Sequence, residues 1–400
     1  MIGLPRRRRR MLAAGAAGAV ALGAAWAGAS AVPPASAADV PVDDRVIVYY
    51  QKQFTDGYAE YISPAPLLHE GTGVDVVNLA AIHMNADVLN LNDLEPGSPL
   101  FDRMWADLAE LQANGIAVVG MVGGAMNSSW ENLEDDYDTQ YPRLRDFVAE
   151  HGLDGVDLDV ETGTDIAVVE SVIADLESDF GPDFLITLSP VTAGLMGRDN
   201  LSGLDYDELY RRSGASIDWF NTQFYCGWGD PTAANYDAIA RYQATRGAGI
   251  PASKIVLAVL TNPENCDEGW VPLDELTASF DVMRTAHPDF GGVAGWEYFN
   301  SLPGGEEEPW RWAAVMREAL DRPVPTPTPN STPTPTPTAS PITPTATPVA
   351  TPSAGELAAT GSNGAAGFSV AAAAAAATAV GALAVGVTLT VRRRLRRAPR

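Results

Sequence analysis

Between Arg45 and Asp321 the chain alternates short, β-branched apolar runs with longer amphipathic stretches. Alternation of strand-like and helix-like segments predicts βα units, whose strands form a parallel sheet. Strands are expected at about residues 45–50, 76–83, 116–122, 153–161, 184–189, 217–225, 254–260 and 292–298. Helices are expected between them, for example over 99–114, 138–151, 164–180, 233–247 and 273–287.

The number of these units favours a closed barrel. Eight βα units are typical of a (β/α)8 barrel, which usually takes roughly 250 residues. The structural alternative is an open, doubly wound sheet. That fold commonly binds a dinucleotide through a Gly-x-Gly-x-x-Gly sequence after its first strand, and none follows Tyr50. The sequence therefore predicts an α/β fold with one (β/α)8 TIM-barrel domain over residues 45–321.

The N-terminal residues 1–37 have the pattern of an export signal. Arg6–Arg10 precede an apolar run, and Ala35–Ala37 offers a small-residue cleavage site. An ordinary amphipathic helix does not fit, because the run has no polar face. We expect the chain to be exported, by either the general or the twin-arginine pathway.

The C-terminal part predicts a stalk and an anchor. Residues 322–356 are rich in Pro and Thr and too poor in large apolar side chains to fold, which predicts an extended linker. The sequence Leu-Ala-Ala-Thr-Gly follows at 357–361. The apolar segment Val370–Val391 is then long enough to span a bilayer, and arginines follow it from Arg392.

This C-terminal arrangement resembles a Gram-positive cell-wall sorting signal, with Ala358 where Pro is more usual. The resemblance implies that a sortase cleaves between Thr360 and Gly361 and joins the chain to peptidoglycan. A plain single-span membrane anchor is the alternative. In either case we expect the folded part to be displayed outside the membrane.

The charge and cysteine content exclude several classes of function. The chain has 26 Lys and Arg against 51 Asp and Glu, a formal net charge of −25. Such a surface repels phosphate backbones, so no nucleic-acid partner is expected. The chain has only 2 cysteines, which is too few for a disulfide-dense scaffold or a Cys-rich zinc module. The histidines show no metal-ligand spacing, so neither a metal nor another cofactor is expected; they are His69, His83, His151 and His287.

The most informative segment is Asp-Gly-Val-Asp-Leu-Asp-Val-Glu at 154–161. Side chains alternate across a strand, so Asp157, Asp159 and Glu161 share one face and apolar side chains occupy the other. In a barrel the three carboxyl groups line the interior toward the C-terminal mouth, where such folds place their active sites. Like charges this close resist joint ionisation, so at least one carboxyl should keep a proton near neutral pH, as a general acid requires.

Two other interpretations of this strand are a surface patch and a metal site. The chain has many acids, but a surface strand does not need the apolar second face formed by Val156, Leu158 and Val160. Carboxylate oxygens would also suit Ca²⁺ or Mg²⁺. We favour a catalytic carboxylate strand over both.

The pattern Asp-Gly-x-Asp-x-Asp-x-Glu resembles the signature of glycoside hydrolase family 18, the chitinases and endo-β-N-acetylglucosaminidases. Gly123 and Gly124, at the end of the third predicted strand, resemble the family's glycine pair beneath the substrate, although Met121 replaces the more usual Ser. Segments 181–188 and 295–305 are more closely similar to the fungal endo-β-N-acetylglucosaminidase T group. That group releases high-mannose N-glycans.

The resemblance implies retaining hydrolysis assisted by the substrate, in which no enzyme carboxylate attacks the sugar. The 2-acetamido oxygen of the −1 N-acetylglucosamine attacks its own C1 and forms an oxazolinium ion. Glu161 would protonate the glycosidic oxygen and then deprotonate the incoming water. Asp159 would hold the acetamide N–H and stabilise the developing positive charge, and Asp157 would couple to Asp159.

Other residues are expected around the same sugar. Gln223 and Tyr225 share one face of the sixth predicted strand, and Tyr225 can donate its O–H to the acetamide oxygen. The resemblance implies that Trp296 floors the −1 sugar and that Tyr49 lines the same subsite. Packing is the alternative role for Tyr225 and Trp296. His83 is expected in the core or at the rim.

Two further positions carry weaker expectations. Glu297 is expected on the strand face opposite Trp296, so it has no assigned role. Cys226 directly follows the sixth predicted strand, and Cys266 lies in the loop after the seventh. These loops are neighbours at the barrel mouth and export permits oxidation, so we predict a disulfide; two free thiols are the alternative.

The leading functional hypothesis is an endo-β-N-acetylglucosaminidase that cuts the chitobiose core of N-glycans, favouring high-mannose forms, with a monomeric catalytic domain. The alternative is a chitinase acting on β1,4-linked N-acetylglucosamine polymers. A non-catalytic sugar-binding adhesin is a more remote alternative, because this chain keeps Glu161, the acid that binding-only family members have typically lost.

Overall fold

The structure is a computed structural model that describes residues 40–324. The export signal, most of the Pro/Thr-rich linker and the sorting signal with Thr360 and Gly361 lie outside the described residues. So does the apolar segment 370–391. Within 40–324, no helix has the length and apolar character needed to cross a membrane.

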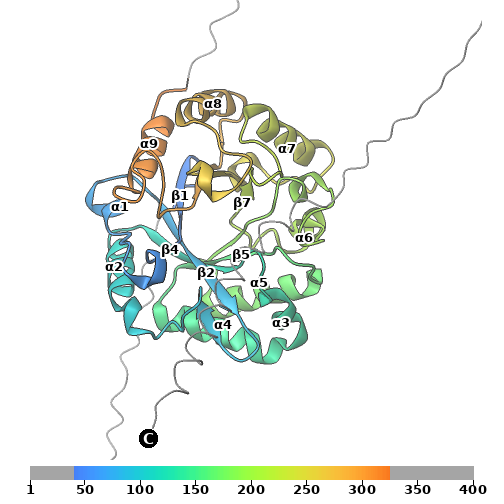
Figure 1. The fold of residues 1–400 in the computed structure, drawn as a ribbon. Helices are drawn as coiled ribbons and strands as arrows, with labels where there is room; N and C mark the ends of the chain where they lie inside the picture. The colour runs from blue at the N-terminus through green and yellow to red at the C-terminus, as the bar shows by residue number, and fades with distance from the viewer. Residues whose placement is uncertain (1–39, 325–400) are drawn as a thin grey trace, which may run out of the picture. The chain divides into compact units, whose positions relative to one another are not determined.

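Parallel strands close into a barrel around the centre of the molecule (Figure 1). Each strand pairs with its neighbour, and β1 pairs with both β2 and β9, which closes the ring. The prediction of a (β/α)8 barrel is confirmed, and the open-sheet alternative is wrong. The barrel strands are β1 (Arg45–Tyr50), β2 (Val76–Met84), β4 (Ala117–Gly123), β5 (Gly155–Asp159), β6 (Leu185–Leu188), β7 (Trp219–Gln223), β8 (Ile255–Leu260) and β9 (Gly292–Trp296).

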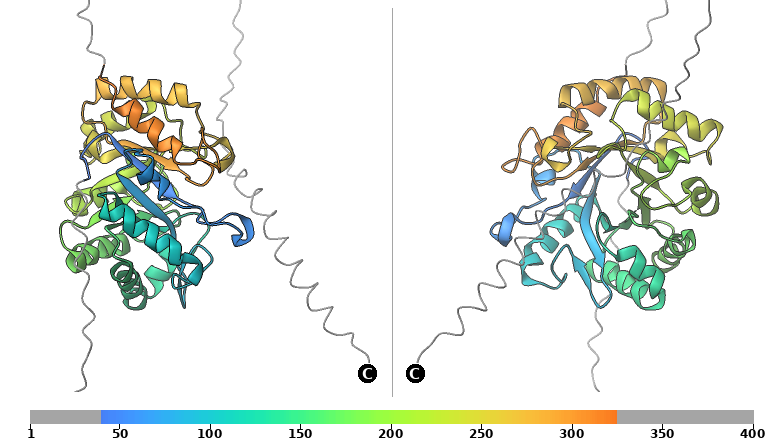
Figure 2. Two further views of the ribbon diagram at one scale, coloured as in Figure 1. Left: turned by 90° about the vertical axis from the view of Figure 1, so that its left-hand side faces the viewer. Right: turned by 45° about the vertical axis from the view of Figure 1, so that its right-hand side comes forward.

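Helices surround the barrel on all sides in Figure 1, and the side views in Figure 2 show them outside the strands. They are α1 (Pro66–His69), α2 (Asp102–Ala113), α3 (Ser129–Asp135), α4 (Tyr137–His151), α5 (Ile166–Phe180), α6 (Tyr206–Ser213), α7 (Ala233–Thr245), α8 (Leu273–Ala286) and α9 (Arg311–Leu320). The predicted helices correspond to α2, α4, α5, α7 and α8. One strand, β3 (Leu89–Leu91), was not expected; it pairs antiparallel with β2 outside the barrel.

Strand alternation separates the core into two parts. Outward-facing residues such as Val156 and Leu158 join a large apolar cluster with residues of the surrounding helices, including Leu144 and Val172. Inward-facing residues form a smaller apolar cluster inside the barrel; it includes Ile47, Val76, Ala117, Val119, Val256 and Ala294. The carboxyl groups of β5 therefore share the barrel interior with apolar side chains, in a medium that disfavours charge.

Aspartates that directly precede three strands help to fix the barrel register. Each accepts a hydrogen bond from the backbone N–H of the adjacent strand, at 2.7–2.8 Å. Register decides which side chains face inward, because a one-residue slip would turn the whole carboxylate strand outward. The pairs are Asp75 with Val46, Asp154 with Val118, and Asp218 with Ile186.

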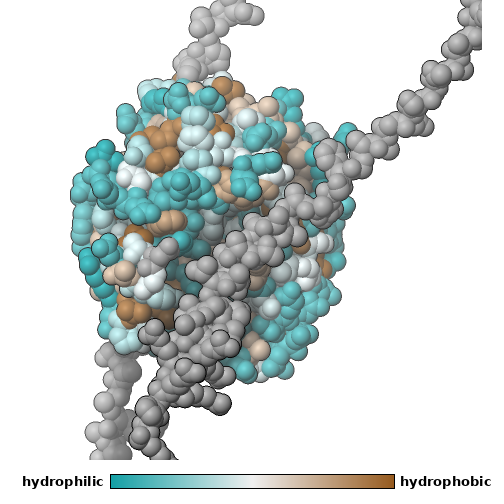
Figure 3. Space-filling view, viewed as in Figure 1, coloured by the Kyte–Doolittle hydropathy of each residue, from teal (hydrophilic) through white to brown (hydrophobic). Residues whose placement is uncertain are grey.

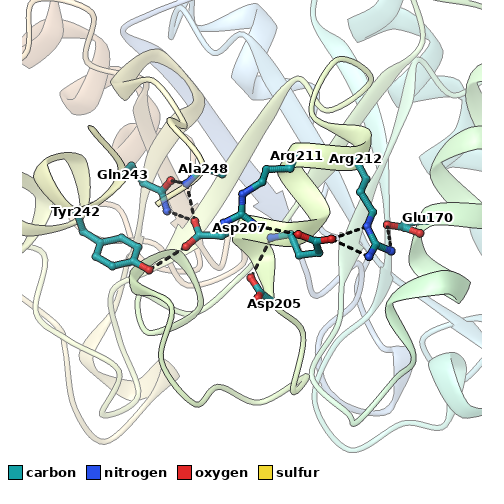
Figure 4. Close-up of polar contacts among 9 residues, drawn as sticks. Glu170, Asp205, Asp207, Arg211, Arg212, Tyr242, Gln243 and Ala248 are labelled. Carbon is teal, nitrogen blue, oxygen red and sulfur yellow. Dashed lines mark hydrogen bonds and ion pairs between the residues drawn. The ribbon is translucent and has the colours of Figure 1, made fainter. Parts of the chain in front are cut away.

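Polar contacts join α6 to both of its neighbours (Figure 4). Asp207 is buried on α6 and accepts hydrogen bonds from Tyr242 Oη at 2.8 Å, Gln243 Nε2 at 2.9 Å and the Ala248 N–H at 3.0 Å. On the other side, Arg212 forms an ion pair with Glu170 of α5. These contacts hold α6, and with it the preceding loop that approaches the carboxylate strand.

The outer surface suits an acidic, water-exposed domain. Hydrophilic residues cover most of the visible face in Figure 3, and apolar residues form separate patches between them. This surface has a plain explanation in solubility and implies nothing about the substrate.

Candidate active site

The carboxylate strand β5 ends at Asp159, two residues before the predicted end. Asp157 and Asp159 point into the barrel, with exposed fractions of 0% and 4%. Glu161 therefore lies on the loop after β5, where it is half-buried. The amide nitrogen of Gln223 joins it to the strand, since Nε2 donates to Asp159 Oδ1 at 3.2 Å and to Glu161 Oε1 at 3.1 Å.

Asp157 has hydrogen-bond donors from three other strands or their ends. It accepts from Tyr49 Oη at 2.8 Å, Thr187 Oγ1 at 2.5 Å, Ser189 Oγ at 2.6 Å and Asn221 Nδ2 at 3.1 Å. Burial raises the pKa of Asp157, but these hydrogen bonds act in the opposite direction. The donors therefore stabilise the carboxylate form of Asp157 inside the barrel.

Asp159 and Glu161 lack such a set of donors. Burial, followed by the negative charges of Glu161 and Asp157, raises the pKa of Asp159 well above its usual value. Burial also raises the pKa of Glu161, and the hydrogen bond from Gln223 opposes this rise. Because these two carboxyls titrate together, the retained proton belongs to the pair. Both shifts favour the protonated form, so the arrangement favours a proton on this pair beside the buried carboxylate of Asp157.

Gly123 and Gly124 let the backbone after β4 approach β5 closely. Both have positive φ, +101° and +95°. A Cβ on Gly123 would lie 2.2 Å from the backbone oxygen of Asp159, and one on Gly124 would lie 3.6 Å from Asp159 Oδ2. The Gly124 N–H donates to that same backbone oxygen at 3.0 Å. The pair therefore positions Asp159 and leaves space beside its carboxyl group.

Tyr225 follows the end of β7 and is 7% exposed. Burial and then the charges of Asp159, Glu161, Asp157 and Glu297 raise its pKa well above the usual value, so it remains a neutral O–H donor. Among residues 40–324 its hydroxyl makes no hydrogen bond, which leaves the proton for a substrate oxygen. The tyrosine therefore lies within the electrostatic reach of Asp159, Glu161 and Asp157.

Aromatic rings from β1 and β9 meet in the barrel mouth. Tyr49 and Trp296 pack edge to face with ring centroids 5.5 Å apart. Trp296 is only partly buried and packs against the interior apolar cluster. Through its hydroxyl, Tyr49 also binds Asp157, so the aromatic pair and the carboxylate strand form one connected site.

Cys226 and Cys266 form a disulfide with Cα atoms 5.7 Å apart. The bridge joins the loop after β7 to the loop after β8. Cys226 directly follows Tyr225, and its N–H donates to the Glu268 carbonyl oxygen at 2.9 Å. The disulfide therefore ties down the segment that carries the Tyr225 hydroxyl.

Replacing both cysteines with serine should lower the free energy of unfolding by about 4 kcal/mol, the chain-entropy value for closing a loop of this length. Urea unfolding of the wild type and the double variant measures the difference. Reductant should destabilise the wild type by a similar amount and leave the variant unchanged. Equal stability of the two proteins under oxidising conditions would contradict a stabilising role.

Several residues of the site had no predicted role. Thr187, Ser189 and Asn221 surround Asp157; strand alternation turns Thr187 and Asn221 inward, and Ser189 directly follows the end of β6. No local signal marked the loop before α6, whose residues Asn200, Leu201 and Ser202 line a narrow pocket beside Glu161 and Gln223 together with Tyr206 at the start of α6. That loop approaches the carboxyls only through the tertiary fold.

The remaining expectations concern His83, Glu297 and metals. His83 is half-buried on β2, and burial lowers its pKa. Glu297 was expected on the strand face opposite Trp296, but β9 ends at Trp296 and strand alternation does not apply beyond it. Within the described range, no three His, Cys, Asp or Glu side chains are grouped so as to hold a metal ion.

Comparisons with solved structures identify relatives of this barrel. A fungal endo-β-N-acetylglucosaminidase from glycosyl hydrolase family 18 is 38% identical, with a TM-score of 0.65 over 71% of this chain and 99% of that chain. Chitinase ChiC from Aspergillus fumigatus is 39% identical, with a TM-score of 0.62; the match covers 69% of this chain and 99% of ChiC. A family 18 chitinase from Pseudoalteromonas aurantia shares the fold. It is 20% identical, with a TM-score of 0.55, and the match covers 68% of this chain and 100% of the chitinase chain.

No family model and no curated protein matches the chain. The identity to the first two solved structures nevertheless extends over almost their whole length, which includes the complete barrel. The chain belongs to glycoside hydrolase family 18 and is a glycoside hydrolase.

Proposed function

We propose that the enzyme is an endo-β-N-acetylglucosaminidase that hydrolyses the chitobiose core of N-glycans, with a preference for high-mannose forms. The observation that carries the reaction type is the coupled pair Asp159 and Glu161, bridged by Gln223 and next to the unpaired hydroxyl of Tyr225. This pair offers a proton at the barrel mouth beside a group suited to hold an acetamide.

In the proposed reaction, the −1 N-acetylglucosamine lies on Trp296. Asp159 accepts a hydrogen bond from the acetamide N–H, and Tyr225 donates one to the acetamide oxygen. That oxygen is thereby held against C1, an arrangement in which proximity alone can lower a barrier by up to about 7–11 kcal/mol. As the oxygen attacks, Glu161 gives its proton to the leaving glycosidic oxygen.

Water then completes the reaction. The oxazolinium ion carries positive charge next to Asp159, whose carboxylate stabilises it. Glu161, now deprotonated, takes a proton from the incoming water, which adds at C1 on the face that the leaving group vacated. The product keeps the β configuration, and both carboxyls return to their starting protonation. Asp157 stays ionised on its hydrogen-bond donors and keeps the proton on the Asp159–Glu161 pair.

A chitinase with the same site is the second candidate. The identity to chitinase ChiC, 39%, is nearly the same as the 38% identity to the fungal endo-β-N-acetylglucosaminidase. The T-group similarity of segments 181–188 and 295–305 favours the first candidate. A sugar-binding adhesin is less well supported, because the acid, the acetamide-binding groups and the aromatic floor are all retained.

Parallel incubations with a high-mannose glycoprotein and with soluble chitin oligomers test the assignment. We expect release of an intact glycan with one reducing N-acetylglucosamine, leaving one N-acetylglucosamine on the protein. Mass spectrometry of both products measures this. Cleavage of chitin oligomers alone would replace the first candidate with the second, and binding without cleavage of either would favour the adhesin.

We also propose that the enzyme is exported and displayed on the cell wall, with a plain membrane anchor as the alternative. This rests on the sequence patterns at 1–37 and 357–400. Changing Thr360 to Ala should prevent sortase attachment and move the enzyme from the peptidoglycan fraction to the membrane or medium. An unchanged distribution would contradict attachment at this site.

A further inference from the structure

Glu297 lies at the barrel mouth, directly after β9. Its backbone oxygen accepts hydrogen bonds from Thr261 Oγ1 at 2.7 Å and from Ser301 Oγ at 2.8 Å. These contacts fix the main chain on both sides of the residue. The main chain at Glu297 is therefore held in place directly after Trp296.

The Glu297 side chain is half-buried, and its Oε2 is fully buried without a hydrogen-bond donor among residues 40–324. Burial raises its pKa to about 7, and the positive charge of Lys52 opposes the rise. The Glu297 charge in turn raises the pKa of Tyr225, so this carboxyl acts on the same site as Asp159 and Glu161. It is a further carboxyl of the active site, and the proposed reaction does not use it.

A second unpaired oxygen belongs to the adjoining loop after β1. The loops after β1 and β9 are joined by backbone hydrogen bonds, from Tyr298 N–H to the Tyr49 oxygen at 2.9 Å and from Phe299 N–H to the Gln51 oxygen at 3.1 Å. Gln51 Oε1 is buried, and no donor in the described part of the chain reaches it. Buried acceptors without donors are costly, by about 1–3 kcal/mol each, so two of them on adjoining loops at the barrel mouth indicate a ligand that brings donors.

The order of strands places these oxygens relative to the bond that is cut. Around the ring, β5 and β9 stand opposite each other, with β6, β7 and β8 between them on one side and β4, β2 and β1 on the other. Glu161 acts on C1 of the −1 sugar from the β5 side. C4 lies across a pyranose ring from C1, so the sugar attached at O4 extends toward β9 and β1.

We propose that Glu297, together with Gln51, binds hydroxyl groups of the sugar attached to O4 of the −1 N-acetylglucosamine. Sugar hydroxyls are donors, which is what the two oxygens require. The proposal rests on the proposed function for the direction of the sugar chain. It makes Glu297 a binding residue for the part of the glycan that remains with the −1 sugar.

Calorimetry in the inactive Glu161→Gln background tests this without catalysis. The probes are a β1,4-linked N-acetylglucosamine dimer, the free high-mannose glycan with one reducing N-acetylglucosamine, and N-acetylglucosamine alone, which lacks the O4-linked sugar. Glu297→Ala should weaken binding of the first two by about 10- to 100-fold, the range for a hydrogen bond to a charged group. Binding of N-acetylglucosamine alone should change by less than about 2-fold.

Two further variants separate binding from folding. Glu297→Gln keeps the shape of the side chain and should retain part of the affinity, and Gln51→Ala should weaken the same two probes. The exposed Glu264, in the loop after β8, supplies the control: Glu264→Gln should leave all three affinities unchanged.

Equal losses for all three probes, or no loss for any of them, would overturn the proposal. If the background protein binds none of the sugars, the proposed function fails as well. If the sugars bind and Glu297→Ala has no effect, only the role of Glu297 fails.

Discussion

Replacing Glu161 with glutamine should lower kcat by about 10³-fold, within the usual range for loss of a general acid. The amide has nearly the same shape and can still contact Gln223, but it has no proton to give to the leaving glycosidic oxygen. Affinity for the bound sugar should change little. Initial rates with a high-mannose glycoprotein measure the first effect, and calorimetry with the free glycan measures the second.

The matched control is Glu150→Gln, which changes an exposed carboxylate near the C-terminal end of the outer helix α4. This variant should keep wild-type kcat. Hydrolysis by Glu161→Gln at a rate close to that of the wild type would contradict the assignment of the acid. A similar loss in both variants would show that the assay reports stability and not chemistry.

Asp159→Asn should lower kcat by about 10²- to 10³-fold, the usual effect of removing one electrostatic stabiliser of a developing charge. It should also move the alkaline limb of the kcat/KM profile to lower pH. In the wild type the proton is shared, and the negative charge within the pair helps to retain it. In the variant only burial raises the pKa of Glu161, so its catalytically required protonated form is lost at lower pH.

A pH series of kcat/KM for the wild type and the Asp159→Asn variant checks both effects at once. An alkaline limb at higher pH in the variant would show that Asp159 does not help Glu161 to retain its proton. A limb that does not move, with kcat reduced, would mean that Asp159 contacts the substrate without sharing the proton. Tyr225→Phe provides a comparison, because it removes a donor to the acetamide oxygen without changing a charge of the pair.

The carboxylate strand shows how much of the site could be predicted from local pattern. Alternation along β5 correctly placed Asp157 and Asp159 inside the barrel, and Val156 and Leu158 outside it. It did not describe Glu161, because the strand ends at Asp159 and the acid lies on the following loop. The same limit applies to Glu297, for which alternation was extended one residue past the end of β9.

The barrel itself and the orientation of its inward residues follow from the sequence, because strand and helix periodicities are local and repeat in every unit. The environment of each carboxyl does not follow from it. Asp157 receives donors from β1, β6 and β7, whereas Asp159 and Glu161 share Gln223 and retain a proton. Only the tertiary structure decides this difference, since a pKa depends on burial and on groups that are distant in the chain and adjacent in space.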